Sequence, residues 1–224
     1  MSELATRLYL VRHGATRLTS EDRFSGAEGV DLSEEGRGQV RRLAERLSRE
    51  EIDAVYASPL GRSLETATLV AEPHGMSPVL RDGLREITHG HWEGLTRREV
   101  EARFPEEYAA WEADPFTFAP QGGESGLSVM GRALPVIREI VLAHPGRRIV
   151  VVSHKATLRL VLSSMLGFDA RGYRDRLEQS PACLNVADFC DPVRARLTLF
   201  NDTSHYAAQP RNCERNLSKW WDAG

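Results

Sequence analysis

Short β-prone runs recur along the chain and are separated by longer amphipathic stretches. The runs predict five strands, at Leu8–Val11, Ala54–Ala57, Ile149–Val152, Leu184–Phe189 and Ala195–Phe200. The first and third runs are entirely apolar, as expected for strands that are covered on both faces of a sheet. The pattern therefore indicates a sheet whose central strands lie deep inside the molecule.

Between these runs, apolar residues recur at helical spacing. Ser33 precedes two glutamates and a stripe of apolar residues, which is typical of a helix start. Four more helical stretches are predicted along the chain. They are an apolar stripe at Leu64, Ala67 and Ala71; the charged stretch from Thr96 to Ala113; a stripe at Leu127, Met130, Leu134, Ile137 and Val141; and a stripe at Leu158, Val161, Leu162, Met165 and Leu166. Pro105 interrupts the second of these stretches, and Pro135 predicts a kink or a late start in the third.

The order of the predicted elements indicates the fold class. Strands that alternate with helices favour an α/β fold with a largely parallel sheet covered by helices on both faces. No repeat or low-complexity linker divides the sequence. We therefore expect one domain over residues 1–206, followed by a C-terminal tail, residues 207–224, to which the sequence assigns no role.

Composition narrows the range of partners. Hydrophobic residues make up 41% of the chain and charged residues 27%, which is sufficient for a full core. The net charge of −3 provides no basic field for nucleic acid or anionic lipid. No apolar run is long enough to span a membrane, no signal-peptide pattern is present, and the three cysteines form no CxxC pair. These features predict a cytoplasmic protein that binds a small molecule, and a homodimer remains open.

Three of the predicted strands end in polar residues. The first strand leads into Arg12 and His13, the second into a Ser-Pro turn followed by Arg62, and the third into Ser153 and His154. In an open parallel sheet, ligands bind beyond the carboxyl ends of the strands. We therefore expect these side chains to converge, although up to 142 positions separate them in the sequence.

Two arginines and two histidines at one place would suit a doubly charged oxyanion. A guanidinium group binds phosphate oxygens in a bidentate manner, and a neutral imidazole is a nucleophile near pH 7. Each residue alone is more simply read as a surface group at the end of a strand. Together they favour a phosphate site.

Several motifs in this order resemble the histidine phosphatase superfamily, which also contains the cofactor-dependent phosphoglycerate mutases. The resemblance covers roughly residues 7–206 and rests on segments that read LVRHGAT (10–16), DLSEEG (31–36), SPLGRSLETA (58–67), LRE (84–86), GHWEG (90–94), GGES (122–125) and VSH (152–154). It implies a phosphoglycerate-mutase-like three-layer sandwich, with a mostly parallel central sheet between two layers of helices.

The resemblance also implies catalytic roles. His13 would be the nucleophile that forms a phosphohistidine, with its second ring nitrogen held by a backbone carbonyl. Arg12, Arg62 and His154 would neutralise the phosphoryl oxygens in the transition state. Glu86 would protonate the leaving alkoxide and then activate water. This scheme needs no metal and no cofactor.

The short segment between Glu86 and His154 favours a phosphatase over a mutase. Only 67 residues separate Glu86 from His154, so the long segment that covers the phosphohistidine in mutases is missing. Water would then reach the intermediate, and hydrolysis would follow. Phe116, Phe118 and Gln121 are candidates for a partial lid. A phosphoglycerate mutase and a non-catalytic module that binds a phosphorylated ligand are the alternatives.

The substrate beyond its phosphate is less defined. Thr19 and Ser25 occupy positions at which the family often has phosphate-contacting amides, and Lys155 replaces a usual glycine. His89 could contact substrate or have a structural role, and with His91 it lacks a third ligand for a metal. Lys155 and His89 favour a substrate that carries a carboxylate. Phosphosugars, phosphoglycerate derivatives, phosphoserine and nucleotide-like esters all remain possible substrates.

Overall fold

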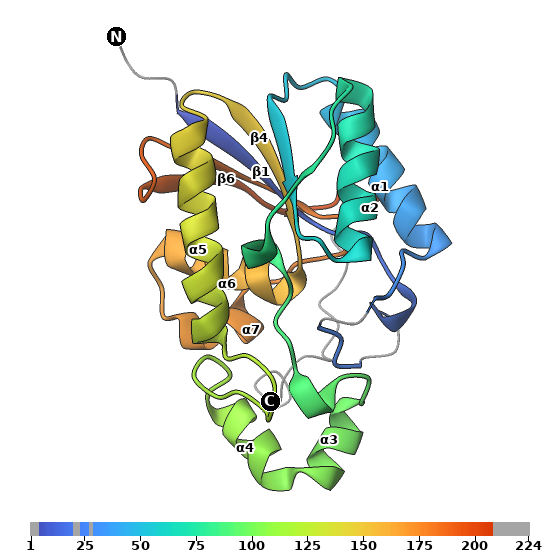
Figure 1. Cartoon of the computed structure of the whole chain (residues 1–224), viewed down its shortest axis with the longest axis vertical. Helices are drawn as coiled ribbons and strands as arrows, with labels where there is room; N and C mark the ends of the chain where they lie inside the picture. The colour runs from blue at the N-terminus through green and yellow to red at the C-terminus, as the bar shows by residue number, and fades with distance from the viewer. Residues whose placement is uncertain (1–4, 20–22, 27–28, 208–224) are drawn as a thin grey trace.

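A six-stranded mixed sheet forms the centre of the molecule (Figure 1). The computed structural model of the chain describes residues 5–19, 23–26 and 29–207. Within them the strands lie in the order β3-β2-β4-β1-β5-β6. Their bounds are β1 (Thr6–Arg12), β2 (Ala54–Ala57), β3 (Val79–Leu80), β4 (Arg148–Ser153), β5 (Leu184–Phe189) and β6 (Ala195–Asp202).

The predicted mostly parallel sheet is confirmed. Strands β1 to β4 are mutually parallel, whereas β5 runs antiparallel to β1 and β6 runs antiparallel to β5. All five predicted strands are present. The two-residue strand β3 was not predicted, because its run is too short to give a periodic signal.

Helices cover both faces of this sheet, as Figure 1 shows. The α-helices are α1 (Glu34–Leu47), α2 (Gly61–Ala71), α3 (Arg97–Arg103), α4 (Pro105–Ala113), α5 (Gly126–Ala143), α6 (Lys155–Leu166) and α7 (Tyr173–Arg176). Short 3-10 helices are η1 (Arg17–Thr19), η2 (Glu72–His74), η3 (Asp82–Leu84), η4 (Gly90–Trp92) and η5 (Ala170–Gly172). Helices α1 and α2 pack on one face, and α5 and α6 pack on the other.

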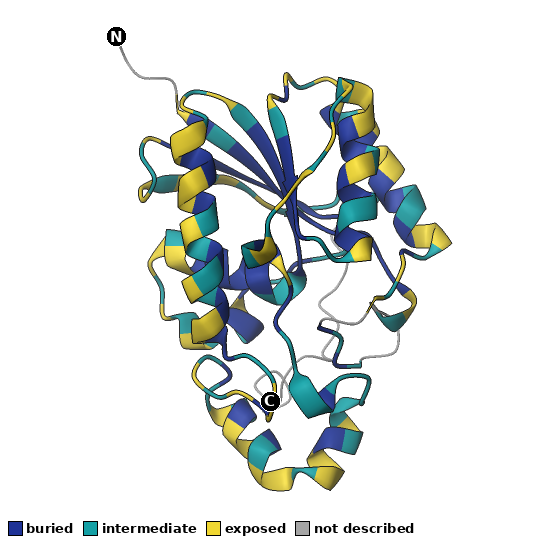
Figure 2. Ribbon diagram, in the orientation of Figure 1, coloured by how far each residue is buried: buried dark blue, intermediate teal, exposed yellow. Residues whose placement is uncertain are grey.

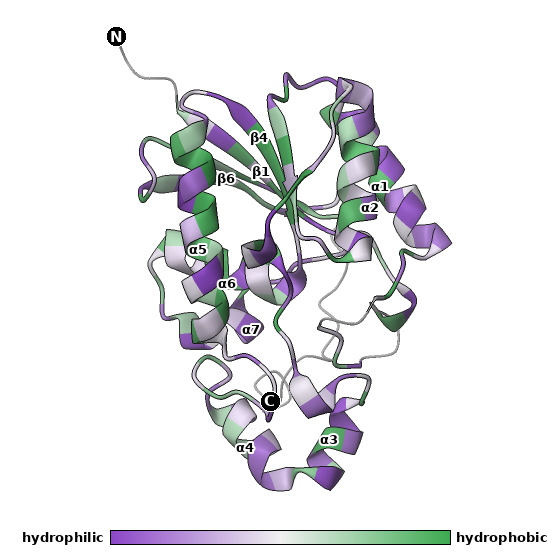
Figure 3. Ribbon diagram, viewed as in Figure 1, coloured by the Kyte–Doolittle hydropathy of each residue, from purple (hydrophilic) through white to green (hydrophobic). Residues whose placement is uncertain are grey.

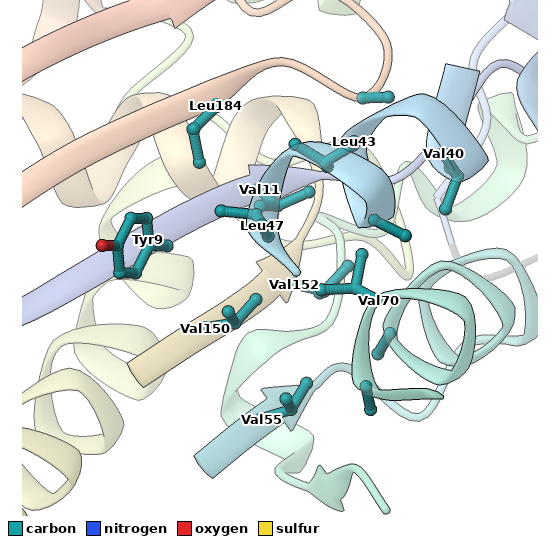
Figure 4. Close-up of a cluster of buried hydrophobic side chains, with 14 of the residues drawn as sticks. Tyr9, Val11, Val40, Leu43, Leu47, Val55, Val70, Val150, Val152 and Leu184 are labelled. Carbon is teal, nitrogen blue, oxygen red and sulfur yellow. The ribbon is translucent and has the colours of Figure 1, made fainter. Parts of the chain in front are cut away.

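Each central strand contributes alternate residues to two cores, because successive side chains of a strand point to opposite faces. In β1, Tyr9 and Val11 pack with α1 and α2, whereas Leu8 and Leu10 pack with α5 and α6. Figure 4 shows the first of these cores, in which Leu43 of α1 is fully buried over the sheet. Helix α1 has buried apolar residues, among them Val40, Leu43 and Leu47, on the side that faces the sheet, and Figure 3 shows its alternation of hydrophobic and hydrophilic residues.

Local signals in the sequence account for where the helices begin. The Ser33 hydroxyl accepts a hydrogen bond from the Gly36 N–H at 3.0 Å and caps α1, as predicted. Thr96 and Glu99 form a reciprocal capping box at the start of α3. Pro105 separates α3 from α4 and occupies the first turn of α4, where its missing N–H costs little.

Helix α5 differs from the prediction in two respects. It begins at Gly126 and continues through Pro135, so the late start suggested by that proline is wrong. Its buried face is formed by Val129, Ala133, Ile137, Ile140 and Val141, whereas Leu127 is 56% exposed. The predicted apolar stripe therefore included one residue from the solvent side of the first turn.

Helices α3 and α4 extend beyond the sheet at the end where β1, β2 and β4 terminate (Figure 1). They enclose a separate apolar cluster, centred on the fully buried Trp92 and completed by Phe24, Val100, Tyr108 and Trp111. Figure 2 shows that the outer sides of both helices are exposed. This small helical region borders the end of the sheet at which the functional residues gather.

Two further predictions concern the C-terminal tail and membrane-spanning segments. The tail from residue 208 lies outside the described residues. Among the described helices, none has the length and the apolar character needed to cross a bilayer.

Candidate active site

The parallel pairing of β1 with β4 creates the site. Arg12, the last residue of β1, lies opposite Ser153, the last residue of β4, so the two chains leave the sheet side by side. The His13 N–H donates to the Ser153 carbonyl at 3.0 Å, which keeps the next residues in register. His13 and His154 follow these strand ends, and their ring centroids lie 5.1 Å apart. The predicted convergence of the strand ends is therefore observed.

The two ring nitrogens of His13 have different partners, a backbone carbonyl at Nδ1 and the Nε–H of Arg62 at Nε2. Its Nδ1 lies 2.8 Å from the Gly14 carbonyl, which can only accept a hydrogen bond, so Nδ1 carries the proton of the neutral ring. Its Nε2 then has a lone pair and lies 3.3 Å from Nε of Arg62. Gly14 is required because a Cβ there would lie 2.7 Å from the Gly36 carbonyl of α1. The backbone carbonyl that the sequence analysis expected to hold the ring is thus Gly14's own.

Backbone carbonyls hold both arginines. Arg62, the second residue of α2, donates through Nη2 to the Gly26 carbonyl at 2.7 Å. Arg12 donates through Nη1 to the Gln179 carbonyl at 2.6 Å. Both side chains are buried, and Nε of Arg12 has no hydrogen-bond partner among the described residues. Neutral carbonyls fix the position of each guanidinium group, and burial lowers the pKa of Arg62 while the nearby charges of Glu86 and Glu93 partly oppose that shift.

His154 is fully buried between β4 and α6. Its Nε2 lies 2.8 Å from the hydroxyl oxygen of Ser58, the residue that follows β2. Its Nδ1 is buried and has no hydrogen-bond partner among the described residues. The ring therefore has one nitrogen engaged by the protein and one that is not.

The surroundings keep both histidines neutral. Burial lowers the pKa of His13 well below its usual value, and the charges of Arg12 and Arg62 lower it further. Burial likewise lowers the pKa of His154, with added effects of His13 and the two arginines. Near pH 7 the ring of His13 therefore retains the lone pair that a nucleophile needs.

Glu86 lies at the N-terminus of α6. Its Oε1 accepts hydrogen bonds from the backbone N–H groups of Ile87 at 3.0 Å and Thr157 at 3.2 Å, and the Thr157 hydroxyl lies at 3.2 Å. Its Oε2 accepts from the Ala156 N–H at 3.2 Å. The Thr157 hydroxyl proton goes to the Arg85 carbonyl at 2.7 Å, so two backbone N–H groups anchor Oε1 and one anchors Oε2. Oε2 is therefore the oxygen better placed to exchange a proton. Helix α6 starts directly after His154, which links the carboxyl group to the histidine pair.

The four predicted substrate-contact residues differ in their surroundings. Thr19 ends η1, but its side chain lies outside the described part of the structure. Ser25 directly precedes Gly26, the residue whose carbonyl binds Arg62. Lys155 is the first residue of α6, and its Nζ lies 3.7 Å from Oε1 of Glu178. Ser25 and Lys155 therefore adjoin the arginine and histidine cluster.

His89 and His91 have separate surroundings. They belong to a 3-10 turn and not to a strand, so the condition for sharing one face is not met. The ring of His89 meets Phe24 edge to face with centroids 4.8 Å apart, and burial lowers its pKa. His91 packs against Phe104 and lies 3.0 Å from Glu107. Among the residues that the structure describes, no group of three His, Cys, Asp or Glu side chains is arranged to hold a metal ion.

The phenylalanines suggested as a lid are packing residues. Phe116 packs beside Ile87, Val129 and Tyr173. Phe118 stacks on Trp92 with ring centroids 5.9 Å apart. Both therefore anchor the loop between α4 and α5. Gln121, the third lid candidate, is exposed in the same loop.

Several functional contacts could not be identified from the sequence. The carbonyls of Gly26 and Gln179 hold the arginines, and a backbone carbonyl carries no residue-type signal. Ser58 was noted as part of a motif, but its contact with His154 depends on the neighbouring positions of β2 and β4. Glu93 accepts from the Gly26 N–H at 2.7 Å and so shapes the loop that binds Arg62.

Comparison with known proteins agrees with this geometry. The profile of the histidine phosphatase superfamily (branch 1) matches residues 8–203. The chain belongs to the histidine phosphatase superfamily. Phosphoserine phosphatase 1 of Hydrogenobacter thermophilus is 37% identical to it over 163 residues, which cover 73% of this chain and 77% of the relative. Glucosyl-3-phosphoglycerate phosphatase of Mycobacterium tuberculosis is 33% identical over 220 residues, which cover 91% and 98% of the two chains.

Solved structures of histidine phosphatases share the fold. YhfR of Bacillus stearothermophilus superposes with a TM-score of 0.83 at 32% identity, over 90% of this chain and 99% of that one. A mycobacterial glucosyl-3-phosphoglycerate phosphatase superposes with a TM-score of 0.79 at 30% identity, over 88% and 99% of the chains. The phosphoglycerate-mutase-like architecture is therefore confirmed. The chain is an enzyme that hydrolyses phosphate monoesters, in a family that works through a phosphohistidine.

Proposed function

We propose that this phosphatase transfers the phosphoryl group of a small phosphomonoester to Nε2 of His13 and then to water. The observation that carries the proposal is the ring of His13 itself. Gly14 accepts from Nδ1, so the lone pair of Nε2 faces the Arg62 side chain at 3.3 Å. A phosphoryl group bound by that guanidinium would lie next to the attacking nitrogen.

Arg12, Arg62 and His154 would stabilise the charge that develops on the phosphoryl oxygens. The two guanidinium groups are buried and are held in place by neutral carbonyls, with the carboxylates of Glu86 and Glu93 as further charges near Arg62. Fixed donors in a buried place need no reorganisation when the reaction occurs, which is the main source of this kind of stabilisation. Because these cations can neutralise a dianion, we propose that the reaction requires no metal and no cofactor.

Glu86 would act as general acid and then as general base. Its Oε1 accepts from the Ile87 and Thr157 N–H groups and its Oε2 from the Ala156 N–H alone, so Oε2 would give a proton to the leaving alkoxide. The same oxygen would then accept a proton from the water that attacks the phosphohistidine. Electrostatic coupling between Glu86 and Arg62 is consistent with a carboxyl group close to the bound phosphate.

We further propose a substrate that carries a carboxylate. The names of two relatives, phosphoserine phosphatase and glucosyl-3-phosphoglycerate phosphatase, both denote phosphate esters of carboxylic acids. Lys155 lies at the start of α6 beside the catalytic cluster, with 24% of its side chain exposed. Thr19, Ser25 and His89 are the other candidates for substrate contacts. The catalytic unit would comprise residues 1–206.

A panel of phosphomonoesters, assayed for released phosphate with excess EDTA present, tests the activity. Phosphoserine and 3-phosphoglycerate should be hydrolysed faster than uncharged alkyl phosphates, and EDTA should have no effect. Loss of activity that a divalent metal restores would refute the metal-free mechanism. Stable isomerisation of phosphoglycerates, primed by the bisphosphate, would identify a mutase instead.

Two variants test the covalent step. His13→Ala should abolish turnover, while His74→Ala, a histidine of η2 remote from the site, serves as the matched control. Glu86→Gln should lose activity on phosphoserine, because an alkoxide needs the proton, but should still be phosphorylated by p-nitrophenyl phosphate. An acid-labile, base-stable phosphate should then accumulate on His13 in rapidly quenched Glu86→Gln. Turnover by His13→Ala would exclude the proposed nucleophile.

A further inference from the structure

Ser58 engages His154 in a way that restricts where the ring carries its proton. The Ser58 hydroxyl oxygen lies 2.8 Å from Nε2 of His154 and 3.3 Å from the backbone nitrogen of Leu60. Both Ser58 and His154 are fully buried, so water does not compete for these groups. The hydroxyl group of Ser58 and the Nε2 atom of His154 must therefore find their hydrogen-bond partners within the protein.

The Leu60 N–H can only donate, so the Ser58 oxygen accepts from it and still has its own proton to place. Among the described residues, the acceptor within hydrogen-bond distance of that hydroxyl proton is Nε2 of His154. A buried donor without a partner costs about 1–3 kcal/mol, so the arrangement in which Ser58 donates is favoured. Nε2 is then an acceptor, and a neutral ring must carry its proton on Nδ1.

The other tautomer leaves two groups unsatisfied. If Nε2 carried the proton and donated to Ser58, the hydroxyl proton would have no acceptor, and Nδ1 would hold a bare lone pair. Nδ1 is buried and has no partner among the described residues, in a ring 5.1 Å from that of His13. A lone pair there would repel a phosphoryl oxygen, whereas an N–H would bind one.

We propose that Ser58 is a positioning residue that fixes His154 as the Nδ1-protonated tautomer and so prepares an N–H donor for the phosphoryl group. The role of His154 toward phosphate rests on the proposed function, whereas the tautomer does not. His13 and His154 would then both carry the proton on Nδ1 but would use their two ring nitrogens differently. In His13 the Nδ1 proton is bound to the protein and Nε2 reacts; in His154 Nε2 is bound to the protein and Nδ1 contacts the substrate.

The tautomer can be observed directly in the unmodified enzyme. Long-range ¹H–¹⁵N correlation spectra of enzyme labelled with ¹⁵N-histidine distinguish a protonated ring nitrogen from a bare one, and the His154→Asn spectrum assigns the signal. We expect Nδ1 of His154 to be protonated and Nε2 bare, both without ligand and with bound vanadate. A ring protonated at Nε2 in both states would overturn the proposal, whatever the variants do.

Variants then test the role of the hydroxyl group. Ser58→Ala should lose the single tautomer and lower kcat/KM by about tenfold to a hundredfold, the range for a residue that orients a catalytic group. Ser58→Thr keeps the hydroxyl and should recover most of the activity. Ser163→Ala is the matched control, because Ser163 is a fully buried serine of α6 whose hydroxyl donates to the Arg159 carbonyl at 2.8 Å.

Each result has a defined meaning. Full activity and an unchanged tautomer in Ser58→Ala would refute the proposal, and an equal loss in Ser163→Ala would reduce Ser58 to a general packing role. If the Ser58 variants do not fold, the wild-type spectrum still decides. Failure of the proposed function has a different signature, since wild-type enzyme would then form no phosphohistidine on His13 whichever tautomer His154 shows.

Discussion

The stability of this enzyme should fall as the solution becomes mildly acidic, because two of its buried histidines resist protonation. The pKa of His13 and that of His154 lie well below the usual value, chiefly through burial, while the unfolded chain restores about 6.5 for each. At pH values above this pKa, both rings are neutral in the folded and in the unfolded protein, so they do not contribute to the pH dependence of stability. Below it, the unfolded state binds protons that the native state refuses, so acid favours unfolding.

The size of the effect follows from this difference in proton binding. Between pH 7.5 and 5.5, each ring that stays neutral in the native state costs about 1.4 kcal/mol of unfolding free energy. His13 is 5% exposed and His154 is fully buried, so solvent screens neither appreciably. The pair should therefore remove about 3 kcal/mol, a large share of the roughly 5–15 kcal/mol that stabilises a typical domain.

Urea unfolding at pH 7.5, 6.5 and 5.5 in phosphate-free buffer measures the loss, provided that the slope with urea stays constant. The decisive comparison is with the double variant His13→Gln/His154→Gln. Its stability should depend less on pH by about 3 kcal/mol over the same range, because other titrating groups contribute equally to both proteins. Identical pH dependence in the two proteins would refute the assignment of both rings as buried neutral groups. The acid limb of kcat/KM should also lie well below pH 6.5, since His13 must be neutral to attack.

Three other predictions follow from single contacts. Arg62→Ala should lower kcat/KM by about a hundredfold to a thousandfold in steady-state kinetics. Arg62→Lys should recover little of this loss, because a point charge cannot replace the planar group that contacts both Gly26 and His13. A fully active Arg62→Ala enzyme would contradict this role. Lys155→Ala should cost more on phosphoserine than on p-nitrophenyl phosphate, and equal losses would show that Lys155 does not read the carboxylate. Leu43→Ala should destabilise the fold by about 2–5 kcal/mol in urea unfolding with kcat nearly unchanged; a loss under 1 kcal/mol would contradict the packing of α1 on the sheet.

Much of the fold and the convergence of Arg12, His13, Arg62 and His154 could be predicted from the sequence, because both depend on strong local signals. Apolar runs located the central strands, and polar residues at their ends located Arg12, His13 and His154. A parallel sheet then requires these ends to meet, whatever the intervening chain does. Glu86 was identified only through its family motif, since a lone carboxylate beside an arginine is typical of a surface ion pair.

The remaining features depend on tertiary contacts that leave no pattern. Val79 and Leu80 form a strand only because β2 offers a parallel edge, and two residues carry no periodicity. The exposure of Leu127 depends on how α5 is rotated against the sheet, which spacing alone does not determine. The pairing of Lys155 with Glu178 joins α6 to the loop before β5, so the sequence could not anticipate that this lysine already has an anionic neighbour.

The position of β1 in the sheet affects how the enzyme acquires activity during folding. β1 lies between β4 and β5, so the strand that carries Arg12 and leads into His13 finds its neighbours only after more than 130 further residues are available. Such long-range pairing is slow compared with the formation of helices. Helix content should therefore return early in refolding while catalysis waits for β1 to enter the sheet. Recovery of phosphatase activity would then come no earlier than the insertion of that strand.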